Sequence, residues 1–311
     1  MRKQILIALG LSLALLAGCA NAVPGGAVSS PADESLGAMG ASSVLSSASE
    51  TLDFVLESEK KGDTRVAEDG TMLASYSYEL PVLRVMTEDG QILDSAATAA
   101  EKAALDAAAA FNSNFEDWLA STDFSGVLDG AEEDYAHRLE SKLDWYNNYE
   151  EEFTYTSWRT DRMISIGGAY YSYTGGAHPN SVFLGWNFDL KTGRFLHPAA
   201  LGEDSEKFQA AVTEEIIRQA DARAAENGFE SPTEMYWEDY QSIAAQWPDY
   251  AVTFSDEGMT VVFSAYGMAS YAAGEQTFVL DWDFLKPYLS EDGRQLLNIS
   301  ADAGDSLKSA P

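Results

Sequence analysis

The sequence predicts an α+β fold in which mainly antiparallel sheets pack against helices as a two-layer sandwich. Residues 182–190 alternate apolar and polar side chains with the period of a strand. Turn signals, a Gly-Gly pair at 175–176 and Lys-Thr-Gly at 191–193, bound this segment. Two stretches with helical periodicity, 95–120 and 205–227, interrupt the strand-like segments. Strand hairpins with helices inserted between them favour the α+β class.

The N-terminal residues 1–18 resemble a lipoprotein signal peptide. Arg2 and Lys3 precede an apolar run at 5–17, which is shorter than the roughly 20 residues of a membrane-spanning helix. The run ends in Leu-Ala-Gly-Cys, the pattern of a lipobox, so Cys19 is the predicted acylated residue. We therefore expect an extracytoplasmic protein that is lipid-anchored to the bacterial cell membrane. Because Cys19 is the only cysteine, a disulfide within the chain and a cysteine-based metal site are excluded.

Residues 19–50 are rich in Ala, Gly, Ser and Pro and have no sustained periodicity, which predicts a flexible tether. The part from 51 to 164 is predicted as an N-terminal α+β region. Its expected elements are strands at 51–61 and 71–86, a helix at 95–120, a helix at 130–151 and a strand at 153–158. Pro81 is expected to end or kink its strand or to lie at an edge. The second helix is expected to turn Tyr135, Leu139, Leu143 and Trp145 or Tyr146 inward.

The part from 165 to 290 is predicted as a C-terminal α+β domain. A strand at 162–173 with a bulge at the Gly-Gly pair 167–168 leads into a tight reversal at Gly175 and Gly176. After the amphipathic helix at 205–227, Ser231 and Pro232 signal the start of a short helix. Strands at 250–254, 259–264 and 276–282 and a closing helix at 283–289 follow, and 291–311 is predicted as a polar, frayed tail.

The charge balance is strongly acidic. Nineteen Lys and Arg against 50 Asp and Glu give a formal net charge of −31. Such a surface repels phosphate backbones, so a nucleic-acid partner is excluded. It would steer a cationic protein toward the chain, although a plain solubilising surface is the simpler interpretation.

The sequence offers no catalytic constellation, and we expect no enzyme activity, no cofactor and no metal. The three histidines, His137, His178 and His197, have no metal-ligand spacing to one another or to Cys19. A Ser-x-x-Lys at 58–61 and the Lys-Thr-Gly at 191–193 match motifs of penicillin-recognising enzymes, but no Ser-Asp-Asn lies between them and a hairpin turn explains the second.

Two blocks carry a family resemblance. YTGGAHP at 173–179 followed by NFDLKTG at 187–193, and then DEGMTVVFSAYGMASYAAGEQTFVLDWDFLKPYL at 256–289, resemble the extracytoplasmic domain shared by the anti-sigma-V factor RsiV, a lysozyme sensor, and the N-terminal part of the peptidoglycan deacetylase PdaC. The resemblance covers roughly residues 52–289. It implies a non-catalytic binding or sensing domain at the cell envelope that recognises lysozyme or cell-wall glycan. The alternatives are an accessory of an envelope glycan hydrolase or deacetylase and a structural lipoprotein that docks a membrane partner.

The ligand-binding residues that the resemblance implies are Tyr173, Gly175, Gly176, His178, Tyr266 and Tyr271. A hydrogen bond that pins its turn is the simpler role for His178, and ligand contact at a hairpin tip is the functional one. The observation that would separate these interpretations is whether His178 and Tyr271 lie together on one exposed surface.

Overall fold

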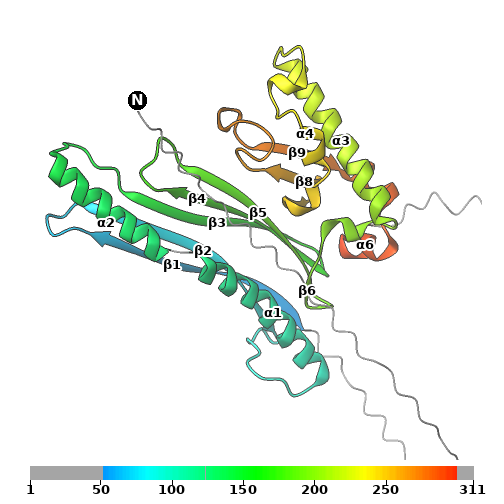
Figure 1. The fold of residues 1–311 in the computed structure, drawn as a ribbon. Helices are drawn as coiled ribbons and strands as arrows, with labels where there is room; N and C mark the ends of the chain where they lie inside the picture. The colour runs from blue at the N-terminus through cyan, green and yellow to red at the C-terminus, as the bar shows by residue number, and fades with distance from the viewer. Residues whose placement is uncertain (1–51, 123, 300–311) are drawn as a thin grey trace, which may run out of the picture. The chain divides into compact units, whose positions relative to one another are not determined.

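The computed structural model describes residues 52–122 and 124–299 (Figure 1). The predicted signal peptide, Cys19 and the tether lie outside the described residues, as does the end of the predicted tail. Within the described part, two sheets and their helices form an α+β fold, as the sequence predicts.

The first sheet has six strands in sequence order. They are β1 (Asp53–Val66), β2 (Met72–Met86), β3 (Tyr149–Arg159), β4 (Met163–Tyr173), β5 (Asn180–Asp189) and β6 (Arg194–Phe195). Neighbours are antiparallel except β2 and β3, which run parallel from the pair Ala74–Tyr149 to the pair Tyr78–Phe153. A parallel pair needs a crossover. The crossover here consists of α1 (Ala99–Ser121) and α2 (Phe124–Ser141), both of which contact β2.

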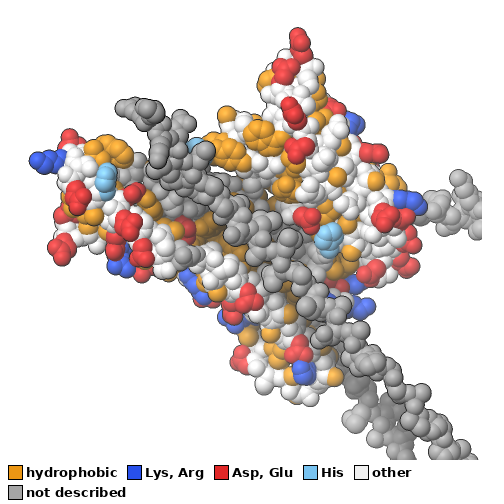
Figure 2. Space-filling model, viewed as in Figure 1, with side chains coloured by type: hydrophobic (Ala, Val, Ile, Leu, Met, Phe, Trp, Pro, Cys, Tyr) orange, Lys and Arg blue, Asp and Glu red, His pale blue; other side chains and the backbone are white. Residues whose placement is uncertain are grey.

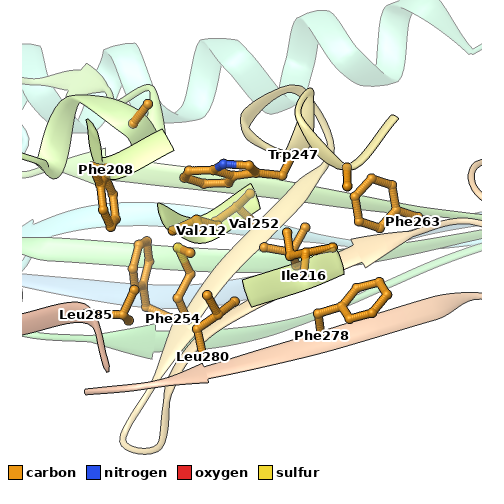
Figure 3. Packing of buried hydrophobic residues seen from close by; sticks show 14 of the residues in the cluster. Phe208, Val212, Ile216, Trp247, Val252, Phe254, Phe263, Phe278, Leu280 and Leu285 are labelled. Atoms are coloured by element: carbon orange, nitrogen blue, oxygen red, sulfur yellow. The ribbon is translucent and has the colours of Figure 1, made fainter. Parts of the chain in front are cut away.

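The second sheet orders β7 (Ala251–Ser255), β8 (Gly258–Phe263) and β9 (Gln276–Asp281) as an antiparallel meander. Helix α3 (Ser205–Glu226) covers it with Phe208, Val212 and Ile216, which pack with Trp247 and side chains of all three strands (Figure 3). Shorter elements complete this half: η1 (Pro198–Leu201), η2 (Pro232–Glu234), α4 (Tyr240–Ala244), η3 (Trp247–Asp249), η4 (Tyr271–Ala273), α5 (Trp282–Leu285), η5 (Lys286–Tyr288) and α6 (Glu291–Leu296).

The two sheets meet where β7 lies against β4 and β5. Gly185 permits the approach, because a Cβ there would lie 2.5 Å from both the backbone nitrogen and the backbone oxygen of Val252. Two hydrogen bonds span the contact: Asn187 donates to the Val252 carbonyl at 2.9 Å, and the Phe254 N–H donates to Ser165 Oγ at 2.9 Å. The polar face of the strand at 182–190 is therefore covered at this end by β7.

The Lys-Thr-Gly turn at 191–193 joins β5 to β6, as predicted, and Gly193 has a φ of 64°. Its anchor is Asp189, which is 2% exposed. Asp189 accepts hydrogen bonds from Arg162 Nη2, the Lys191 N–H and Thr192 Oγ1, each at 3.0 Å. Burial by itself raises the pKa of Asp189, but these bonds and the positive charge of Arg162 hold it below its ordinary value.

The predicted helix at 130–151 is wrong at both ends. Helix α2 begins at Phe124 and ends at Ser141, and residues 149–151 belong to β3. Tyr135 is buried and Tyr146 half-buried, but Leu139, Leu143 and Trp145 are exposed by 54%, 39% and 66%. Leu143 and Trp145 lie beyond the end of α2, so their helical spacing does not place them on the buried face of that helix.

The predicted bulge at 167–168 is also wrong. Strand β4 pairs through Gly167 and Gly168 without a shift in register on either side. Gly168 instead leaves room for two neighbouring aromatic rings. A Cβ on Gly168 would lie 2.7 Å from the Phe153 ring and 2.8 Å from the Trp186 ring.

The reversal after β4 is looser than predicted. Ser172 pairs with Asn180, and of the two glycines between them only Gly175 has a positive φ, 78°.

Pro81 neither ends nor interrupts its strand. It lies within β2 opposite Ser58, beyond the stretch that pairs with β3.

The segment after residue 290 is not a frayed tail where it is described. Ser290 caps α6, and Leu296 and Leu297 are each 3% exposed within the core between α3 and the second sheet. The predicted boundary between residues 164 and 165 falls inside β4, in the interior of the first sheet.

Candidate functional site

His178, Tyr266 and Tyr271 form one aromatic cluster. The His178 and Tyr271 rings are stacked, with centroids 3.6 Å apart and planes 18° from parallel. The Tyr266 hydroxyl lies 3.3 Å from His178 Nε2, and the two tyrosine rings are 5.5 Å apart. His178 comes from the loop between β4 and β5, whereas both tyrosines come from the segment between β8 and β9. The structure thus brings together residues of both sequence blocks.

His178 is fixed by contacts on both ring nitrogens. Nδ1 lies 2.9 Å from the carbonyl oxygen of Pro179, which can only accept a hydrogen bond. That contact places a proton on Nδ1, so in the neutral ring Nε2 accepts from the Tyr266 hydroxyl. These contacts hold the turn at His178 in place, which is the simpler of the two roles expected from the sequence. The ring is still exposed.

Tyr266 is held in an uncommon backbone conformation. Its φ is 68°, a region that bulky residues rarely adopt, and its side chain is 54% exposed. Its carbonyl accepts a hydrogen bond from Trp237 Nε1 at 3.2 Å, and the Ser264 carbonyl closes the turn by accepting from the Gly267 N–H at 2.7 Å. Ser264 also ties the segment to the first sheet, since its Oγ accepts from the Phe183 N–H at 2.9 Å. Strained residues of this kind collect at functional sites.

Acidic and aromatic side chains of the first sheet adjoin the cluster. In the antiparallel register Tyr171 lies opposite Glu152, and Tyr173 lies opposite Glu150, so all four project from one face. Burial, then Glu150, Tyr173 and Tyr271, raise the pKa of Tyr171. Both glutamates are exposed. Figure 2 shows hydrophobic side chains exposed over the segment between β8 and β9, and acidic side chains spread over the same view.

The other predicted site residues are not members of the aromatic cluster itself. Tyr173 Oη accepts a hydrogen bond from Asn147 at 3.2 Å. Gly175 faces Tyr149, whose ring would be 2.8 Å from a Cβ there, while a Cβ on Gly176 would meet nothing closer than 3.8 Å. Gly175 thus has a packing reason for being glycine, and its predicted role in ligand binding stays a prediction.

Sequence reasoning missed Tyr171 and Trp237. The period-2 spacing of Tyr171 and Tyr173 is a signal that could have placed the former on the same face. Trp237, 39% exposed, lies in the connection after η2, and no local pattern links it to Tyr266.

A buried acid, Glu151, lies on the opposite face of β3. Its two carboxylate oxygens accept hydrogen bonds from the Tyr78 hydroxyl and, at 2.6 Å, from the Tyr170 hydroxyl. Burial first, and Glu151 second, raise the pKa of both tyrosines, which keeps their hydroxyls protonated as donors. With the acid 4% exposed, this arrangement satisfies the hydrogen bonding of a buried carboxyl group and presents no group to a substrate.

Among residues 52–122 and 124–299, no three His, Cys, Asp or Glu side chains are grouped so as to hold a metal ion. No helix of this described part is long and apolar enough to cross a membrane.

Comparison with known proteins finds a family match for one segment of the chain. Residues 201–283 match the family described as "Protein of unknown function (DUF3298)". The match spans α3 through β9 and includes Tyr266 and Tyr271, whereas His178 precedes it. No curated protein matches the chain.

Two solved structures of DUF3298 proteins resemble the chain. One, from Bacteroides fragilis NCTC 9343, is 13% identical with a TM-score of 0.56, and the match covers 81% of this chain and 99% of that one. The other, from Pseudomonas aeruginosa PAO1, is 12% identical with a TM-score of 0.44, covering 78% and 96%. The first likeness shows that the fold is shared. Neither description names a ligand or an activity.

Proposed function

We propose that the protein is a non-catalytic, lipid-anchored binding or sensing domain of the cell envelope, and that its aromatic cluster recognises a cationic protein such as lysozyme. The observation that supports this most is the stacking of His178 on Tyr271 at an exposed surface. The stacked pair joins two blocks that lie far apart in the chain, and His178 remains exposed.

The chemistry of the surface suits a protein partner. Tyrosine rings supply large, rigid contact area and a polar tip, and such side chains dominate binding energy at interfaces. The exposed Glu150 and Glu152 lie beside them, and the whole chain carries a net charge of −31. Complementary charge would raise the association rate of a cationic partner and would make its binding weaken as salt rises.

The test is titration calorimetry of the purified protein with lysozyme at low and moderate salt. We expect binding at low salt that weakens as salt is added. Tyr271→Ala should weaken it by about tenfold or more, the scale of a hot-spot side chain. Trp145→Ala, which removes an exposed aromatic side chain of the α2–β3 connection outside the cluster, is the matched control and should bind as the wild type does.

Two outcomes would overturn the proposal. One is the absence of heat at tens of micromolar of each protein. The other is equal binding of a different cationic protein, such as cytochrome c, because the interaction would then be charge attraction alone.

Tyr266→Gly separates a binding role from a structural one. Glycine adopts the positive φ of this position freely, so the melting temperature should stay equal or rise, while the side chain that contacts His178 is lost. Reduced lysozyme binding in a fully stable variant would support a ligand role for the cluster. Unchanged binding would remove Tyr266 from the site.

A further inference from the structure

A second surface lies at the other end of β3. Two adjoining cavities, each of about 450 Å³, share Trp158 and Asp256 among their lining residues. Each is within the range of roughly 300–1,000 Å³ typical of small-molecule sites. Trp158 is eight residues along β3 from Glu150, a distance of about 26 Å, so this groove is separate from the aromatic cluster.

Two tryptophans are fixed in this groove by one residue. Trp158 Nε1 donates to the Asp256 carboxylate at 2.9 Å, and Trp282 Nε1 donates to the Asp256 carbonyl at 3.0 Å. Their ring centroids are 6.3 Å apart. Trp282 also packs on Phe254, with centroids 6.1 Å apart and planes 11° from parallel. Both indoles are half-buried, so their orientation is set before any ligand arrives.

The rest of the lining is rich in hydroxyl groups. Thr156 and Ser157 of β3 and Thr253 and Ser255 of β7 line one cavity, and Asn298 lines the other. Hydroxyl and amide groups both donate and accept hydrogen bonds, which matches a ligand that carries many hydroxyls.

The charges of the groove favour an uncharged ligand. Arg159 is already bound to the Asp53 carboxylate at 2.6 Å and to the Phe54 carbonyl. Lys286 pairs with Asp283 at 3.4 Å. Asp256 and Glu257 are acidic and exposed. The groove therefore offers little unpaired positive charge to an anion.

We propose that this groove binds a saccharide chain, with Trp158 and Trp282 as the platforms for its sugar rings. The apolar C–H faces of a sugar pack against indole rings, while its hydroxyls bond to the Thr, Ser, Asn and Asp groups around them. The two adjoining cavities would place successive rings on either side of Trp158. This site does not rest on the proposed function of the aromatic cluster.

The first test follows the indole N–H signals of the seven tryptophans by two-dimensional NMR. The full chain carrying Cys19→Ser, which removes the predicted acylation site, is titrated with N-acetylchitohexaose and, separately, with cellohexaose. Signals are assigned with single Trp→Phe variants. We expect the signals of Trp158 and Trp282 to shift with one of the sugars, while that of Trp145 stays. No shift with either sugar at millimolar concentration, or an equal shift of Trp145, would overturn the proposal.

The second test compares dissociation constants. Trp158→Ala should weaken binding by about tenfold or more, and Trp282→Phe, which keeps the packing on Phe254, should weaken it less. Trp145→Ala is the matched control for an exposed tryptophan outside the groove. Tyr271→Ala should leave sugar binding unchanged. Loss of sugar binding in that variant alone would move the site to the aromatic cluster and refute the groove.

Discussion

Replacing Gly185 by alanine should lower the free energy of unfolding by about 3–5 kcal/mol. The new Cβ would lie 2.5 Å from the backbone nitrogen and oxygen of Val252, atoms that no side-chain rotation can move away. Ordinary carbon contacts are about 3.5–4.0 Å, so β5 and β7 would have to separate by about 1 Å.

That separation has two costs. Overpacking a close contact typically costs about 1–3 kcal/mol. The bonds from Asn187 to Val252 and from Phe254 to Ser165, both 2.9 Å, bridge the same contact and would lengthen toward the limit of a hydrogen bond. Each contributes about 1 kcal/mol, which brings the total to the stated range.

The assay is urea unfolding followed by tryptophan fluorescence and by circular dichroism. Gly176→Ala is the control, because a Cβ there meets nothing closer than 3.8 Å and its φ is not positive. It should change the free energy of unfolding by less than about 0.5 kcal/mol. If Gly185→Ala lies within about 1 kcal/mol of the wild type, the argument from the close approach of the two sheets is refuted.

Two further predictions concern Asp189 and Leu296. The pKa of Asp189 is lower in the folded state, so its contribution to stability is complete above its unfolded pKa of about 4 and is lost as pH falls through the folded value. Asp189→Asn should therefore flatten the fall in melting temperature below about pH 4. Asp283→Asn, at a 95% exposed side chain, is the control and should not flatten it. Parallel curves of melting temperature against pH for Asp189→Asn and the wild type would contradict this prediction. Leu296→Ala should cost about 2–5 kcal/mol in denaturant unfolding because the side chain is 3% exposed, and a loss under about 0.5 kcal/mol would mean that α6 is not part of the core.

Elements whose signals are local were predictable from the sequence. Phe208, Val212 and Ile216 recur at helical spacing, and all three are buried on α3. The Ser231 start signal appears as a capping box with Glu234. The Lys-Thr-Gly turn forms the expected hairpin. In each case the residues that decide the structure lie within a few positions of one another.

Features that depend on distant partners were not predictable. Gly168 resembles a bulge signal in isolation, and its reason becomes visible only when the rings of Phe153 and Trp186 are placed against it. The apolar residues Leu143 and Trp145 continue the helical pattern of α2, although the chain has already left the helix. No neighbouring residue in the sequence indicates that these two side chains no longer face a surface on which to pack.

The candidate site divides in the same way. His178 and Tyr271 were named from the family resemblance, and their stacking requires the loop after β4 and the segment after β8 to meet. Sequence spacing cannot supply that contact. It could have added Tyr171 through strand periodicity, but it could not have added Trp237, which reaches Tyr266 through a side-chain bond to its backbone.

The parallel pairing of β2 with β3 has a consequence for the order of folding. The hydrogen bond between Tyr78 and Glu151 joins residues 73 positions apart, whereas the β3–β4 and β4–β5 connections span only a few residues each. Closing the longer loop costs about 2–2.5 kcal/mol more in chain entropy, so the meander of β3, β4 and β5 should form before β2 docks on it. During that interval the edge of β3 is unpaired and open to association with other chains. The edge residues are Glu150, Glu151 and Glu152, whose negative charges oppose such pairing. When β2 docks, the Tyr78 hydroxyl donates a hydrogen bond to Glu151.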